Sequence, residues 1–130
     1  MARLAAGDSA QAITLASLGV YLHALDPGPH ALLADLLLAR DGVTDVAVME
    51  SYAACILAPT QPASWRRWGM ISFVRDRNSE ALAALERYFS LGGSAARDDE
   101  QAVRALAETK RRLPGGELAQ EAVRSGPGSR

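Results

Sequence analysis

The stretch that decides the fold is residues 62–93, which read PASWRRWGMISFVRDRNSEALAALERYFSLGG. In this stretch, large aromatic residues and small residues occur at defined distances from one another. Trp65 is followed by Trp68 and then by Gly69, and Ala81 comes twelve residues after the glycine. Small residues let two helix backbones approach closely, and large residues fill the space between neighbouring pairs of helices. The spacing therefore predicts two helices joined by a turn.

The spacing recurs along the chain, which favours a repeat over a single hairpin. Ala47 lies 34 residues before Ala81, and Pro59 follows Ala47 by twelve residues, where the unit ends. Ala12 begins an earlier helix in the same way, and that segment runs to Pro27. A fixed period of this size is the sequence signature of stacked helical units.

The pattern resembles the tetratricopeptide repeat, a helix–turn–helix unit that reads W-x2-L-G-x2-Y, then A-x3-F, then P. The resemblance covers residues 7–93. The middle unit departs from it, because the positions of the Trp, Leu, Gly and Tyr are held by Ala31, Ala34, Asp35 and Leu38. The resemblance implies an all-α superhelix of helical hairpins, with about six helices. We expect this repeat domain to span residues 1–113 and a flexible tail to follow at 114–130.

Composition and charge exclude several classes of protein. The 130 residues carry a net charge of −1, from 14 basic and 15 acidic side chains. A general binder of nucleic acid or of anionic membranes is normally more basic. One cysteine permits no intrachain disulfide, and no apolar run is long enough to span a bilayer. The N-terminus lacks the pattern of a secretory signal, so we expect a soluble, cytoplasmic protein.

Capping residues, prolines and glycines place the expected helices. They predict six helices, at residues 8–25, 30–40, 45–57, 60–75, 80–91 and 99–113. In the phase of the repeat, the second and third helices form one pair, and the fourth and fifth form the next. Asp98 is expected to cap the last helix, which covers the end of the array.

No catalytic motif is present in the sequence. It has no nucleophile elbow, no phosphate-binding loop, no H-E-x-x-H and no paired C-x-x-C. Asp98, Asp99 and Glu100 open a helix, where carboxylates stabilise the positive end, so we interpret them as capping residues rather than acid/base catalysts. His23 and His30 flank a turn, and we interpret them as surface or turn residues rather than metal ligands. We expect neither an enzyme nor a bound metal or cofactor.

The remaining reactive and basic side chains also have simple interpretations. Cys55 lies in an apolar helical stretch and is interpreted as a small core residue rather than a nucleophile. Arg66 and Arg67 flank Trp65 and Trp68, an arrangement that could stack on nucleic acid. Alternatively, the tryptophans occupy core positions and the arginines reach solvent. The near-zero net charge favours the second interpretation, and we expect no nucleic-acid partner.

The resemblance also implies a binding surface. Tetratricopeptide arrays hold a partner segment on the concave surface, which the first helix of each pair lines. Carried over in phase, the lining residues are Leu32, Leu36, Ala39, Arg66, Met70 and Phe73. Members that bind acidic C-terminal tails carry Lys, Arg or Asn at such positions, whereas Leu32, Leu36 and Met70 stand here. The implied surface is an apolar trough that suits an amphipathic helix or an extended hydrophobic segment.

The overall layout is similar to that of the small cytosolic chaperones of bacterial type III secretion systems. Residues 7–42 have the helix–turn–helix length of their central repeat, and residues 65–92 follow the layout of their last repeat. Those chaperones bind hydrophobic translocator or needle subunits before export. The similarity implies a chaperone or adaptor for a secretion-system protein. The alternative is a constitutive scaffold subunit of a larger multiprotein complex.

The first predicted helix has two apolar stripes. One consists of Ile13, Ala16, Val20 and Ala24, and the other of Leu15, Leu18, Leu22 and Leu25. The repeat pattern calls for a further helix before Gly7, for which the preceding residues are too few. The second helix can cover only one stripe. We therefore expect the leucine stripe to mediate homodimerisation or the docking of another protein.

Overall fold

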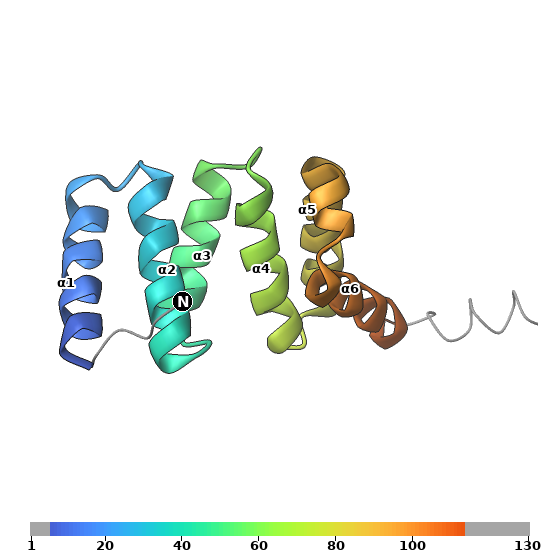
Figure 1. Ribbon diagram of the computed structural model, residues 1–130, viewed down its shortest axis with the longest axis horizontal. Coiled ribbons are helices and arrows are strands. Elements are labelled where there is room, and N and C mark those ends of the chain that lie inside the picture. Colours follow the sequence, from blue (N-terminus) through green and yellow to red (C-terminus); the bar gives the residue numbers. More distant parts are fainter. Residues whose placement is uncertain (1–5, 114–130) are drawn as a thin grey trace, which may run out of the picture.

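A computed structural model describes residues 6–113, which form six α-helices and no strand. The helices are α1 (Ala6–Leu22), α2 (Pro27–Asp41), α3 (Asp45–Leu57), α4 (Pro62–Val74), α5 (Asn78–Arg97) and α6 (Glu100–Arg112). They follow one another in a row along the longest axis of the molecule (Figure 1). The prediction of an all-α chain is confirmed. The predicted tail at 114–130 lies outside the described residues.

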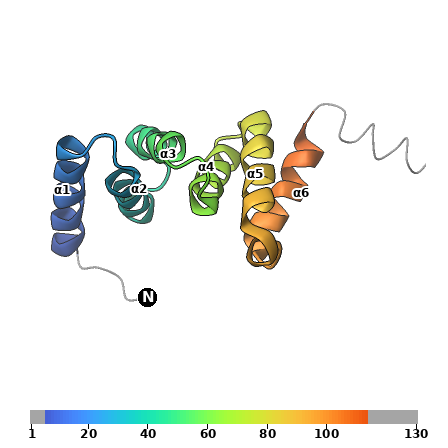
Figure 2. The same ribbon diagram turned by 90° about the horizontal axis from the view of Figure 1, so that it is seen from above.

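Each helix packs against the next one in the chain. The contact is most extensive between α4 and α5 and between α2 and α3, the pairs expected from the phase of the repeat. Seen from above, α1 and α5 are inclined to the axes of α2, α3 and α4 (Figure 2). Besides α5, α6 also contacts α4, so that α4, α5 and α6 enclose a common core.

The small residues of the sequence pattern lie where helices touch. Ala47 and Ala81 are fully buried. A Cβ atom added at Gly69 would lie 2.8 Å from the side chain of Leu85 and 3.3 Å from its backbone nitrogen. The absence of a side chain at Gly69 thus lets α4 approach the backbone of α5 closely. Ala12, the first member of the repeating series, is only half-buried.

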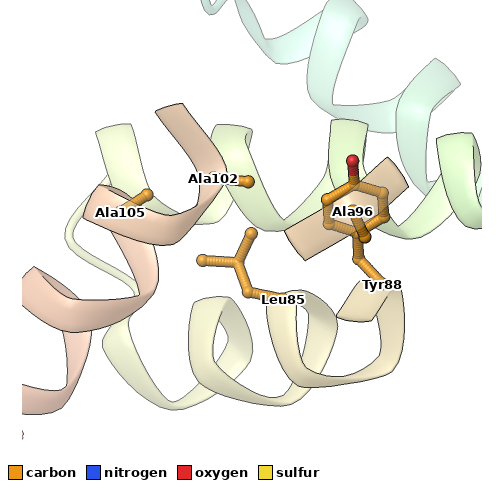
Figure 3. Close-up of a cluster of buried hydrophobic side chains, with 5 residues drawn as sticks. All are labelled: Leu85, Tyr88, Ala96, Ala102 and Ala105. Atoms are coloured by element: carbon orange, nitrogen blue, oxygen red, sulfur yellow. The ribbon is translucent and has the colours of Figure 1, made fainter. Parts of the chain in front are cut away.

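Two hydrophobic clusters stabilise the two ends of the row. The first cluster joins α1, α2 and α3 and consists of Ala16, Leu33, Leu37 and Ala47. The second joins α5 and α6 and consists of Leu85, Tyr88, Ala96, Ala102 and Ala105 (Figure 3). Leu85 is the largest fully buried side chain. In Figure 3 it extends from α5 towards the small side chains Ala102 and Ala105 of α6. The larger side chains of Trp65, Met70, Phe73, Phe89 and Leu106 pack around this cluster.

The boundaries around the first turn differ from those predicted. Helix α1 ends at Leu22 rather than Leu25, and α2 begins at Pro27 rather than His30. The reason is that Asp26 and Pro27 together start α2, three residues before the predicted start at His30. The Asp26 side chain accepts a hydrogen bond of 3.0 Å from the Gly28 nitrogen, and Pro27 occupies the first helical position, where its missing N–H costs nothing.

The end of α5 is also corrected. The helix was predicted to stop at Gly92-Gly93, but helical turns continue to Arg97 after a kink at Gly93, whose φ is +61°. Glycine adopts that conformation without steric cost. The kink brings Ala96 back against Gly92, where an added Cβ would lie 2.6 Å from the Ala96 Cβ. The cap of α6 is therefore displaced by one residue, to Asp99 rather than Asp98.

Candidate partner-binding groove

Two adjoining pockets lie along α4. One, of about 420 Å³, opens between α2 and α4, and the other, of about 930 Å³, opens between α4 and α6. Both are lined by Met70, Val74 and Gln101. Because they share these side chains, the two pockets form one surface depression that crosses α2, α4 and α6. We refer to it as the α4 groove.

The α4 groove is lined by both apolar and charged side chains. Val74 is 63% exposed, and Met70 beside it is half-buried. The other apolar lining residues are Leu38, Val43, Ala63, Ile71, Phe73, Ala105 and Ala107. The charged ones are Asp35, Arg66, Arg67, Glu100, Arg104, Glu108 and Arg111. The lining thus combines apolar side chains with three acidic and four basic ones.

The predicted groove residues fall into two groups. Arg66 and Met70 line the α4 groove, and so does Phe73. Neither pocket includes Leu32, Leu36 or Ala39. Leu36 packs against the cluster of α1, α2 and α3, whereas Leu32 and Ala39 are exposed outside the groove.

Helix α2 contributes a different face to the groove from the one predicted. The residues that it presents are Asp35 and Leu38. Val74 was missed because it ends α4, although its position four residues after Met70 places both on one helix face. Applying this spacing to Met70 would have found it from the sequence alone.

The Arg66 guanidinium is paired with a carboxylate rather than free in the groove. Its Nε donates to Asp99 Oδ2 at 2.5 Å, and the Tyr88 hydroxyl donates to the same oxygen at 2.7 Å. Asp99 Oδ1 accepts from the Ala102 nitrogen at 3.2 Å and so caps α6. The hydrogen bond from Arg66, aided by those from Tyr88 and Ala102, holds the pKa of Asp99 well below its usual value. This cluster fixes α4, α5 and α6 to one another beside the groove.

Arg67 spans the first pocket. Its guanidinium donates to both carboxylate oxygens of Asp35, at 2.7 and 3.0 Å, and so joins α4 to α2. The Arg67 side chain is largely buried, so the expectation that it reaches solvent is wrong. Bidentate pairs of this kind fix geometry as well as charge. Arg66 and Arg67 are thus both paired, so neither guanidinium is free to bind an acidic ligand.

The two tryptophans of α4 act in packing. Trp65 packs against the cluster of α5 and α6, and its indole nitrogen donates to the Pro59 carbonyl at 2.6 Å. Trp68 lies against Tyr52 of α3, with ring centroids 5.0 Å apart and the rings tilted. Both rings therefore have protein partners, as the core interpretation of these residues requires.

His30 is buried, which corrects its interpretation as a surface or turn residue. Its Nδ1 lies 2.6 Å from Glu50 Oε2, and its Nε2 lies 2.7 Å from the Ala24 carbonyl oxygen. Both neighbours accept hydrogen bonds, so the doubly protonated ring fits the site best. Burial opposes that charge, but the bonds to Ala24 and Glu50 and the nearby Asp26 outweigh it, and the pKa of His30 is raised above 6.5. The ring ties the α1–α2 turn to α3.

This arrangement predicts a pH-dependent stability. A raised folded-state pKa means that the contribution of protonated His30 is fully present below pH 6.5 and is lost as the pH rises through the folded-state value. We expect His30→Gln to cost about 1–2 kcal/mol at pH 6, because it breaks buried hydrogen bonds to a charged group, and to flatten the fall in stability towards pH 9. Urea unfolding across this range measures both effects. The control is His23→Gln at the exposed neighbouring histidine, and an equal slope in both variants would contradict the assignment.

Cys55 is buried, as its interpretation as a core residue predicts. Burial raises the pKa of its thiol to about 11, so the reactive thiolate is scarce at neutral pH. Within residues 6–113, no cluster of three or more His, Cys, Asp or Glu side chains is placed to hold a metal ion.

Two further apolar surfaces lie outside the α4 groove. On α1, Ile13, Ala16 and Val20 pack towards α2, whereas Leu15, Leu18 and Leu22 are exposed, as is Leu25 in the turn that follows. On α3, a second exposed stripe consists of Val46, Met49, Tyr52 and Ile56. Exposed apolar patches of this kind often mark sites of protein contact.

The chain matches no family model, no curated protein and no solved structure. None of the helices between residues 6 and 113 is both long and apolar enough to cross a membrane.

Proposed function

We propose that this chain is a protein-interaction module of tetratricopeptide type whose α4 groove holds the apolar face of a segment from another protein. The observation that carries the proposal is the shared strip of Met70 and Val74, which stays accessible between α2 and α6. Burying an apolar side chain against such a strip stabilises a complex without requiring any particular polar group.

The chemistry of the groove favours a hydrophobic or amphipathic segment over an acidic tail. Arg66 and Arg67 are already paired with Asp99 and Asp35, so binding a carboxylate at either guanidinium would require breaking its pair. An amphipathic helix needs only an apolar groove and a polar rim. Methionine adapts its shape to different side chains, so Met70 suits more than one partner sequence.

Within this class, we favour a chaperone or adaptor that protects a hydrophobic subunit of a secretion system before export. An open groove suits this role, because the bound segment must later be released. A constitutive scaffold subunit is the second candidate. It is favoured by the exposed apolar stripes of α1 and α3, which a permanent assembly would cover.

Binding of a model helix tests the groove directly. The probe is a fluorescently labelled amphipathic peptide with leucine at i, i+3, i+4 and i+7 and with glutamine and lysine elsewhere. We expect Val74→Asp to weaken binding by about tenfold or more, since it places a charge on the apolar strip. Val74 is largely exposed, so the variant should fold. Met70→Asp is a second test at the neighbouring position.

The matched control is Ile56→Asp, which makes the same kind of change on the exposed stripe of α3. Fluorescence anisotropy gives the dissociation constants, and circular dichroism checks that each variant remains helical. Equal weakening by Val74→Asp and Ile56→Asp, or by neither, would place peptide binding outside the α4 groove.

A further inference from the structure

The exposed face of α1 and its following turn has the spacing of a coiled-coil seam. Leu15, Leu18 and Leu22 of α1 are separated by three and four residues, the alternation that puts side chains at the a and d positions of a heptad. Leu25 follows in the turn after α1. All four are at least half exposed, as is Tyr21 next to them. We refer to these five side chains as the α1 seam.

The hydroxyl groups of Thr14 and Ser17, beside the α1 seam, are already satisfied. The Thr14 hydroxyl donates to the Ala10 carbonyl at 2.9 Å, and the Ser17 hydroxyl donates to the Ile13 carbonyl at 2.7 Å. Burying them under another helix would therefore leave no donor without a partner. No Asp, Glu, Lys or Arg occurs between Ser9 and Leu25. An identical surface would thus meet no like-charge repulsion.

We propose that a second copy of this chain packs antiparallel on the α1 seam, around a two-fold axis. In an antiparallel pair an a position faces a d position, so Leu18 would face Leu22 of the second copy. Covering five large apolar side chains on each copy buries on the order of 1,000 Å² in total, near the lower limit for a specific interface. Antiparallel packing also sets each helix dipole against the opposite end of its neighbour.

Sedimentation velocity of the full chain over a range of concentrations tests the proposal. We expect a reversible dimer at tens of micromolar. We expect Leu18→Glu to weaken dimerisation by about 100-fold or more, because the charge enters the interface twice. Ile56→Glu, the same change on α3, should leave the dimer intact. A monomeric unmodified protein, or a dimer unaffected by Leu18→Glu, would overturn the proposal.

Cysteine cross-linking tests the orientation even if a glutamate variant folds poorly. Under mild oxidation, a mixture of Leu18→Cys and Leu22→Cys chains should form disulfide-linked heterodimers faster than either variant alone forms homodimers. The buried Cys55 can be replaced by alanine in both. Faster self-linking of Leu18→Cys would indicate parallel helices, and no linking would indicate a different interface; both results overturn the proposal. Neither measurement depends on the α4 groove, so this proposal and the proposed function can fail separately.

Discussion

The Gly69→Ala substitution is expected to lower the free energy of unfolding by about 2 kcal/mol, because an added methyl group overpacks a core that is already filled. The new Cβ atom would lie 2.8 Å from Leu85 and 3.3 Å from its backbone nitrogen. Leu85 is fully buried and cannot move without disturbing the cluster of α5 and α6. The loss is measured as a decrease in the urea midpoint of the Gly69→Ala variant.

A matched control separates packing from helix propensity. Gly7 also lies in a helix, but no atom lies within 4 Å of an added Cβ. Gly7→Ala should therefore leave stability unchanged or raise it by up to about 1 kcal/mol. Ala81→Leu, at the other fully buried small position of this hairpin, should cost about 1–3 kcal/mol. If Gly69→Ala and Ala81→Leu both unfold at the midpoint of the unmodified protein, α4 and α5 do not pack as described.

The second large effect is expected at Asp99. Asp99→Ala should cost about 2–3 kcal/mol, because it removes a helix cap and leaves two hydrogen-bond donors without their acceptor. Those donors are the Arg66 guanidinium and the Tyr88 hydroxyl. Because the pKa of Asp99 is lowered, its contribution should be present above pH 3.8 and be lost as the pH falls below that value. Chemical unfolding of the unmodified protein and of Asp99→Ala at pH 7 and pH 3 measures both the cost of the substitution and its pH dependence.

Asp98→Ala is the control for this prediction. Asp98 is the adjacent acid and is exposed, and a surface substitution of this kind usually changes stability by about 0.5 kcal/mol or less. The loss of stability in Asp99→Asn should lie between those of Asp98→Ala and Asp99→Ala, since an amide oxygen can still cap α6 but carries no charge. Equal losses for Asp98→Ala and Asp99→Ala would show that Asp99 does not join α4, α5 and α6 in the way described.

The helices could be predicted from local signals. Proline, glycine and capping residues determine where a helix begins or ends, and they act over a few residues. The start and end of α3 agree with prediction for this reason. The continuation of α5 to Arg97 could not be predicted, because Gly92-Gly93 reads locally as a stop. The contact that decides it, Ala96 against Gly92, exists only after the chain has turned back.

The groove could be predicted only where its residues follow the spacing of one helix. Met70 was expected, and Val74 follows from it by one helical turn. The face that α2 presents depends on how it is rotated against α3 and α4, which no local pattern encodes. Asp35 and Leu38 therefore line the groove in place of Leu32 and Leu36. The burial of His30 was missed for the same reason, because Glu50 lies twenty residues further along the chain.

Mapping the backbone amides of the isotope-labelled protein by NMR, with and without the amphipathic peptide, tests the central claim most directly. The resonances that shift should belong to Met70, Val74 and Gln101 and their neighbours on α2, α4 and α6. Those of the exposed stripe on α3, around Met49 and Ile56, should stay in place. Shifts confined to α1 or α3, with the resonances of α4 unchanged, would contradict a partner-binding groove along α4.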